Sequence, residues 1–181
     1  FLAGCRLAPY KRIDLVIEAF KLLGPDYRLK IFGDGVDLKR LRRLAVDCPG
    51  IEFLGRVSEE EKADLYSRAQ AFINPQEEDF GITAVEAMAA GRPVIAYRRG
   101  GATETVVEGK TGLFFDEQTP EALATVLKGF SATAFDPRAI RAWAEKFSVS
   151  EFKRQIQDVL TAVRTPQKMR PGNSEMHQQP V

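Results

Sequence analysis

The sequence of 181 residues contains one histidine and two cysteines. The histidine, His177, lies in a polar stretch near the end of the chain, which disfavours a Cys–His nucleophile and a histidine-rich metal site. Cys5 and Cys48 are too few for a disulfide framework and indicate a reducing compartment, so we expect a cytoplasmic protein. No apolar run approaches the roughly 18–20 residues of a membrane span, and no signal peptide is visible.

The sequence also lacks an excess of charge of either sign. Its 26 Lys and Arg residues nearly balance its 25 Asp and Glu residues and leave a net charge of +1. Net charge therefore predicts neither a nucleic-acid-binding nor a membrane-binding surface. We interpret the basic cluster Lys39, Arg40, Arg42 and Arg43 as the solvent face of an amphipathic helix. The chain length and the 44% hydrophobic content fit one globular domain with a core of its own.

Short apolar runs predict strands at residues 1–4, 29–32, 51–54, 71–74, 94–97 and 112–115. Helical patterns alternate with them, which predicts an α/β fold with a Rossmann-like parallel sheet of about six strands and helices on both faces. We expect this domain over residues 1–164 and a disordered tail over residues 165–181. Because the sequence opens on FLAG, inside a predicted strand, we expect its first residue to be a fragment boundary.

The stretch EEDFGITAVEAMAAG, residues 77–91, runs from a predicted strand through a glycine-containing loop into a helix. Glu78 would lie on the loop, and Gly81 would let the backbone turn and approach a ligand closely. The free N–H groups after Gly81 would begin a helix that favours anions. Glu86 lies about one turn inside that helix and can reach back to the same pocket. Carboxylates beside an anion site suit hydroxyl groups, so we predict a ligand with both phosphate and sugar hydroxyls.

Four predicted loops follow strands and should meet at one edge of the sheet, at residues 5–11, 33–35, 55–58 and 76–83. In an open parallel sheet, ligands bind beyond the carboxyl ends of the strands. Each of these loops contains glycine, charged residues or both, as a nucleotide-sugar site requires. No acidic pair has the spacing of a metal site, so we expect no metal.

The stretch 77–91, together with the following GRPVIAYRRGGATETVVEGKTGLFF, resembles the signature of glycosyltransferase family 4, a GT-B-fold family of retaining enzymes. The resemblance spans residues 1–130 and is weaker beyond them. It implies that the chain is one half of a GT-B fold, the C-terminal domain that binds the nucleotide-sugar donor. A complete member also has an N-terminal acceptor-binding domain of similar size. The resemblance implies that this domain is absent from the chain and that the isolated fragment does not transfer sugar.

The resemblance also implies catalytic roles. Arg6 and Lys11 would meet the negative charge of the departing nucleoside diphosphate, with no metal or other cofactor. Cys5 stands where a glycine is common in the family. Glu78 would contact donor-sugar hydroxyls near the reacting carbon, either as a covalent nucleophile or as a stabilising charge while the acceptor attacks from the diphosphate side. Glu86 would accept hydrogen bonds from the ribose hydroxyls.

Further donor-binding residues implied by the resemblance lie in three loops and are Gly33, Gly35, Arg56, Val57, Phe80, Gly81, Ile82 and Thr83. Ile82 and Thr83 would offer N–H groups to the diphosphate, and the segment FLGRV would place Arg56 and Val57 beside the nucleobase. The Gly-Asp-Gly turn at residues 33–35 would let a backbone edge approach the nucleoside. The alternative is that these residues form a simple tight turn without a role in binding. The pair Gly100-Gly101 fits either the family pattern or a turn that caps a helix.

The leading hypothesis is the donor-binding domain of a retaining hexosyltransferase with a GDP- or UDP-linked donor and a glycan or lipid-linked acceptor. PYKRIDLVIEAF and the stretch that begins EEDFGITAVEAM most resemble bacterial mannosyltransferases that use GDP-mannose. The alternative is a non-catalytic nucleotide-sugar-binding regulatory module, and sugar transfer by a longer chain would distinguish the two. A nucleotide-sugar epimerase of the same fold would need a different acid/base set. We expect no nucleic-acid partner, and a peripheral membrane position of the full-length enzyme stays open.

Overall fold

The computed structural model describes residues 1–164, so the predicted tail lies outside the described residues. The chain divides into two compact units, Phe1–Phe147 and a second unit that begins at Ser148. The single domain expected over residues 1–164 therefore stays a prediction. The residues predicted for the site all fall in the first unit.

Within residues 1–164, six parallel strands form one sheet in the order β3-β2-β1-β4-β5-β6. Their bounds are Leu2–Gly4 (β1), Leu29–Phe32 (β2), Ile51–Gly55 (β3), Phe72–Asn74 (β4), Val94–Tyr97 (β5) and Gly112–Phe115 (β6). Each predicted strand is present to within one residue at either end. The predicted Rossmann-like fold class is confirmed.

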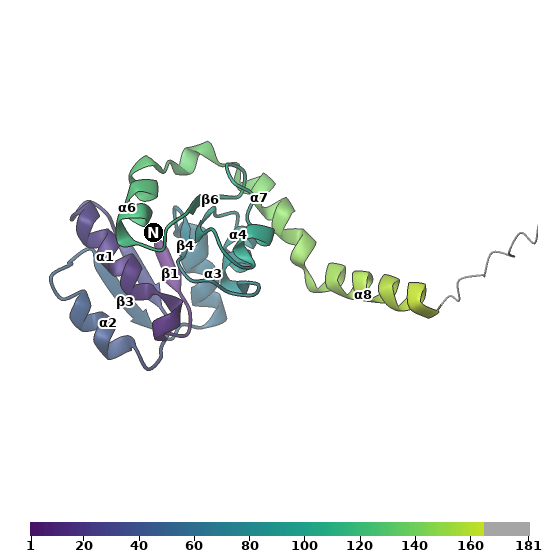
Figure 1. The fold of residues 1–181 in the computed structure, drawn as a ribbon, viewed down its shortest axis with the longest axis horizontal. Coiled ribbons are helices and arrows are strands. Elements are labelled where there is room, and N and C mark those ends of the chain that lie inside the picture. Colours follow the sequence, from purple (N-terminus) through teal and green to yellow (C-terminus); the bar gives the residue numbers. More distant parts are fainter. Residues whose placement is uncertain (165–181) are drawn as a thin grey trace, which may run out of the picture. The chain divides into compact units, whose positions relative to one another are not determined.

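Successive side chains of the strands enter two separate cores, as the two-residue period of a strand requires. Ile31, Ile73 and Ile95 belong to one core, while their neighbours Phe72 and Val94 belong to the other. Three helices cover the first core, namely α1 (Ile13–Leu23), α2 (Leu38–Leu44) and α6 (Pro120–Gly129). The opposite face is covered by α3 (Glu59–Arg68), α4 (Ile82–Ala89) and α7 (Pro137–Ala144), as Figure 1 shows.

Local sequence signals fix the starts of three helices, α3, α6 and α7. The Ser58 hydroxyl accepts from the Glu61 N–H (3.1 Å) and the Glu61 carboxylate accepts from the Ser58 N–H (2.7 Å), so the predicted capping box is confirmed. Thr119 and Asp136 cap α6 and α7 through their side chains, each followed by proline. The remaining short elements are η1 (Pro9–Lys11), α5 (Ala102–Thr105), η2 (Ala132–Ala134) and η3 (Glu145–Phe147).

The helix predicted over residues 36–46 is shorter than expected. It is α2, Leu38–Leu44, and Val36 and Val46 lie outside it with exposed side chains. The Asp37 N–H donates to the Leu7 carbonyl oxygen (3.1 Å), a bond to another loop that holds the preceding turn in a non-helical course. Such a tertiary contact is not visible in the periodicity of the sequence.

The second unit contains α8, Val149–Arg164, where a helix over residues 150–163 is predicted. Arg154 forms ion pairs with Glu151 and Asp158, three and four positions away on the same helix. Of the helices in residues 1–164, none is long and apolar enough to cross a membrane.

Candidate functional site

The order in which the strands are added reverses at β1, because β2 and β3 lie on one side of it and β4, β5 and β6 lie on the other. β1 pairs with β2 on one side and with β4 on the other. The chain leaves β1 for α1 on one face of the sheet, whereas it leaves β4 for α4 on the opposite face. The two connections therefore diverge and open a crevice at the carboxyl ends of these strands, the place where open α/β sheets bind ligands.

The crevice is a cleft of about 570 Å³ lined entirely by these two connections. Its volume lies within the roughly 300–1,000 Å³ range of small-molecule sites. The loop after β1 contributes Cys5, Arg6, Tyr10 and Lys11, and the other connection contributes residues 77–83. Of the predicted site residues, the cleft brings together Arg6, Lys11, Glu78, Phe80, Gly81, Ile82 and Thr83.

The predicted glycines Gly33 and Gly35 support the loop after β1. A Cβ on Gly33 would overlap the carbonyl oxygen of Cys5, and a Cβ on Gly35 would overlap that of Leu7. The Leu7 N–H donates to the carbonyl oxygen of the aspartate between the two glycines (2.9 Å), and the Leu7 side chain is fully buried. The turn therefore fixes the loop that holds the two cations of the cleft, and its contact with a nucleoside stays a prediction.

The connection after β4 turns at Gly81. This residue has φ 83° and ψ 60°, in the left-handed region that favours glycine, and it precedes the first turn of α4. The N–H groups of Ile82 and Thr83 belong to that first turn, where a helix offers no backbone acceptor. Because both residues line the cleft, the positive end of the helix lies at the cleft and favours an anion there.

Lys11 and Glu78 form an ion pair inside the cleft, between Nζ and Oε1. Their side chains are only 15% and 17% exposed, so the pair is shielded from water. Burial lowers the pKa of Lys11, and Cys5 opposes this shift. Lys11 Nζ also lies 5.0 Å from the ring centroid of Tyr10. A cation and an anion thus stand side by side in the cleft.

The other two polar residues of the loop after β1 differ in character. Arg6 is exposed at the cleft, and within residues 1–164 it forms no hydrogen bond or ion pair. Burial raises the pKa of Cys5 to about 11, although Lys11 opposes the shift. The Cys5 thiol is therefore protonated near neutral pH, which excludes it as a thiolate nucleophile.

Glu86 lies on α4 but does not line the cleft. Its Oε1 accepts a hydrogen bond from Lys62 Nζ (3.1 Å) and its Oε2 accepts one from the Tyr66 hydroxyl (3.0 Å), both on α3. The Glu86 side chain is 33% exposed, so its remaining lone pairs are open to a ligand. Its role toward a ribose stays a prediction.

Lys62 and Tyr66 are the residues around Glu86 that the sequence reasoning missed. Burial lowers the pKa of Lys62, but hydrogen bonds to Glu59 and Glu86 outweigh it and leave the pKa raised. Burial, together with the Glu86 charge, raises the pKa of Tyr66, so its hydroxyl stays a donor. Their four-residue spacing after the capping box places them on one face of α3, a signal that could have identified them.

Arg56 and Val57 follow β3, two strands away from β1 and therefore roughly 10 Å along the sheet edge. Arg56 is 86% exposed and pairs with Asp34 (3.3 Å), and Val57 packs partly buried against the core under α3 and α4. Neither residue lines the cleft between β1 and β4. A contact of Arg56 and Val57 with a nucleobase therefore stays a prediction.

The pair Gly100-Gly101 holds the Glu78 loop. The Gly101 N–H donates to the Glu78 carbonyl oxygen (2.7 Å), and a Cβ on Gly100 would overlap that same oxygen. Gly101 also precedes the first turn of α5. The pair thus begins a helix, as one of the two interpretations predicts, and it also packs against the backbone of the cleft.

The described residues 1–164 contain no cluster of three His, Cys, Asp or Glu side chains arranged to hold a metal ion. The metal independence of the site stays a prediction.

A family model described as "Glycosyl transferases group 1" matches residues 2–147. Among curated proteins, the chain is 37% identical over 147 residues to the GDP-mannose-dependent alpha-(1-6)-phosphatidylinositol monomannoside mannosyltransferase of Mycolicibacterium smegmatis, a match that covers 74% of the chain and 38% of that protein. It is 37% identical over 118 residues to the uncharacterized glycosyltransferase MJ1178 of Methanocaldococcus jannaschii, covering 64% of the chain and 33% of that protein. The chain thus spans well under half the length of these relatives.

Among solved structures, the chain is similar to Anabaena Alr3699/HepE in complex with UDP. The TM-score is 0.75 at 27% identity, over 90% of this chain and 49% of that one. The same protein in complex with UDP-glucose gives a TM-score of 0.76 at 26% identity, again over 90% of this chain and 49% of that one.

Proposed function

The chain belongs to the group 1 glycosyl transferase family, and from this premise we propose that it is the donor-binding domain of a retaining hexosyltransferase of glycosyltransferase family 4. The main support is the Lys11–Glu78 ion pair in the cleft between the β1 and β4 connections, beside the start of α4. A nucleotide sugar needs both halves of this pair, a cation for its diphosphate and a carboxylate for its hydroxyls.

We propose that the cleft stabilises the departing diphosphate. When the bond between the anomeric carbon and the diphosphate oxygen breaks, both electrons leave with that oxygen. In this proposal, Lys11, Arg6 and the first N–H groups of α4, which line or adjoin the cleft, would meet this charge. Donors already in position act without reorganisation, which is the basis of electrostatic catalysis and makes a metal unnecessary in this proposal.

Glu78 is the proposed partner of the sugar. Its carboxylate would accept hydrogen bonds from the sugar hydroxyls and stabilise positive charge at the anomeric carbon. In one route to retention, the acceptor oxygen attacks from the diphosphate side and passes its proton to the diphosphate oxygen. In the other, Glu78 first forms a covalent bond to that carbon as the diphosphate departs. The acceptor oxygen then displaces the Glu78 carboxylate and passes its proton to the diphosphate.

We propose a GDP- or UDP-linked hexose as the donor. GDP-mannose is the first candidate because a relative at 37% identity is named as GDP-mannose-dependent. UDP-glucose is the second, because a similar structure contains it. Since the chain spans 38% of the mannosyltransferase relative, we propose that the acceptor binds to a region outside the matched part.

A ligand panel tests this proposal. GDP, UDP, ADP and their sugars are added to the chain, and melting temperatures are measured. A ligand at about 100 times its dissociation constant should stabilise the protein by about 2.7 kcal/mol, roughly 5–10 °C for a chain of this size. The absence of a shift with any of them would exclude a formed donor site. If a longer protein containing this chain binds the donor but transfers no sugar, the regulatory-module alternative is correct.

Glu86→Ala is expected to weaken nucleoside binding by roughly tenfold or more, because hydrogen bonds to a charged group contribute about 1.5–3 kcal/mol. Calorimetric titration with guanosine and uridine measures the effect, and Glu86→Gln should keep part of the affinity. Glu60→Ala, which removes an exposed carboxylate of α3, is the matched control. Unchanged nucleoside affinity in Glu86→Ala would exclude the ribose role.

A further inference from the structure

Arg12 and Gln118 tie together three connections that are far apart in the sequence. Arg12 Nη1 donates to Gln118 Oε1 (2.7 Å), across 106 positions of the chain. Gln118 Nε2 then donates to the carbonyl oxygen of Pro75 (2.9 Å), 43 positions away. The amide of Gln118 therefore uses its acceptor on one loop and its donor on another, and both bonds are partly buried.

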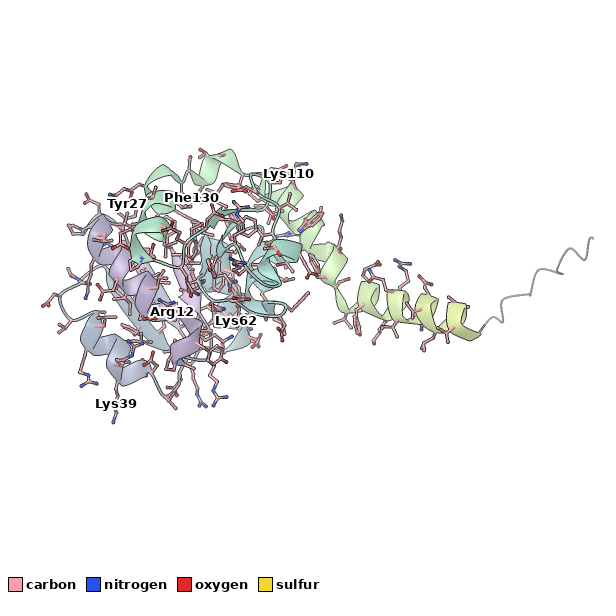
Figure 2. The ribbon with its side chains drawn as sticks, viewed as in Figure 1. Arg12, Tyr27, Lys39, Lys62, Lys110 and Phe130 are labelled. Atoms are coloured by element: carbon pink, nitrogen blue, oxygen red, sulfur yellow. The ribbon has the colours of Figure 1, made fainter. Side chains whose placement is uncertain are left out.

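Arg12 has an unusual backbone. Its φ is 53° and its ψ 31°, and it is the only non-glycine residue with positive φ among residues 1–164. Figure 2 labels it at the start of α1. A non-glycine residue keeps this conformation only where its surroundings hold it. Here the guanidinium is fixed by Gln118 and lies 3.5 Å from the Asp14 carboxylate. Glycine would suit this backbone conformation better than arginine does. The contacts of the Arg12 side chain are therefore the reason to expect a role for this residue.

The hydrogen bonds from Arg12 to Gln118 and from Gln118 to Pro75 form a bridge between two loops. The two ends of this bridge adjoin the two charges of the cleft. Arg12 directly follows Lys11, and Pro75 begins the connection that contains Glu78. A bridge from Arg12 to Pro75 therefore sets the separation of the two loops on which the ion pair depends. The core beneath does not need it, because α1 and α6 already pack through fully buried residues such as Ile17, Leu123 and Leu127.

We propose that Arg12 and Gln118 are positioning residues that hold Lys11 and Glu78 at the spacing required by the diphosphate and the sugar of one donor. This inference rests on the proposed function and deepens it. In this proposal, the bridge contacts neither the diphosphate nor the sugar of the donor. It determines whether Lys11 and Glu78 can bind these two groups at the same time.

The variants Arg12→Gly and Gln118→Ala test the bridge in complementary ways. Arg12→Gly removes the guanidinium and relieves the positive φ, so the fold should be retained. Gln118→Ala removes both hydrogen bonds and leaves Arg12 in place. Gln118→Glu keeps an acceptor for Arg12 but places a carboxylate against the Pro75 carbonyl oxygen, so it separates the two halves of the bridge. Arg28→Gly, in the loop before β2 at the opposite edge of the sheet, is the matched control.

Calorimetric titration measures the affinity for UDP-glucose and GDP-mannose, with uridine and guanosine as comparison ligands. We expect Arg12→Gly and Gln118→Ala each to weaken the nucleotide sugar bound by the wild type by roughly 10- to 100-fold, because small misplacements of site groups have effects of this size. Nucleoside affinity should stay close to wild type in both variants. The melting temperature should stay close to wild type in Arg12→Gly, which relieves the positive φ, and should be lower in Gln118→Ala, which removes two partly buried hydrogen bonds. The double variant should lose no more than the single ones, as expected for one shared interaction.

Three outcomes would overturn the bridge. Nucleotide-sugar affinity could stay at the wild-type value in both variants, nucleoside affinity could fall as much as nucleotide-sugar affinity, or Arg28→Gly could have the same effect. If wild type itself binds no nucleotide sugar, the proposed function fails and the bridge fails with it. Wild-type binding therefore separates the failure of the function from the failure of the bridge.

Discussion

Replacing Lys11 with methionine is expected to weaken the binding of nucleoside diphosphates by roughly 10- to 100-fold, because a charge-assisted hydrogen bond contributes about 1.5–3 kcal/mol. Methionine keeps most of the aliphatic stem and removes the ammonium group, with its charge and its hydrogen-bond donors. The loss leaves Glu78, with a side chain 17% exposed, as an unpaired carboxylate beside the incoming diphosphate. Repulsion between the two anions adds to the loss. Calorimetric titration with GDP and UDP measures the change.

Nucleosides provide the comparison for Lys11→Met. Guanosine and uridine have no phosphate, so their affinities should change by less than about twofold, and equal loss for nucleosides and diphosphates would mean that Lys11 acts elsewhere. Lys110→Met, an exposed lysine just before β6 that Figure 2 labels, is the matched control. The double variant Lys11→Met/Glu78→Gln should recover part of the diphosphate affinity, because it removes the unpaired charge.

Most of the fold could be predicted from local sequence. Apolar runs located every strand, and side-chain caps at Ser58, Thr119 and Asp136 located three helix starts. These signals are readable because each depends on residues within one turn of one another. The order of the strands then placed the loop after β1 beside the connection after β4, which is why Lys11 and Glu78 meet. The resemblance is confirmed at the level of the group 1 glycosyl transferases, while membership of family 4 and retention stay predictions.

The parts that could not be predicted are contacts between distant segments. The pairing of Glu86 with Lys62 joins two helices, and the bond from Arg12 to Gln118 joins two loops. Such partners depend on the twist and register of the sheet, which no local pattern specifies. For the same reason, the sequence predicted only one of the two roles of Gly100-Gly101. Its turn is a local feature, whereas its contact with the Glu78 backbone is not.

Gly100→Ala is expected to destabilise the protein by about 2–4 kcal/mol and to lower the melting temperature by roughly 5–15 °C. Two effects add. Gly100 has φ 58°, a conformation that disfavours alanine, and a Cβ there would overlap the carbonyl oxygen of Glu78. The Glu78 loop must therefore move away from Gly100, which changes its position relative to Lys11. Nucleotide-sugar affinity should fall with stability, although no side chain of the cleft has changed.

Gly109→Ala separates the two effects. Gly109 has φ 71°, but a Cβ there would meet nothing within 4 Å. This variant should lose only the backbone part, about 1 kcal/mol, and keep the wild-type affinity for nucleotide sugars. Thermal unfolding and calorimetric titration of both variants measure the difference. If Gly100→Ala loses no more stability or affinity than Gly109→Ala, the Glu78 loop yields freely and does not depend on Gly100 for its position. A larger loss of both in Gly100→Ala means that the backbone after β5 fixes the carboxylate that faces Lys11.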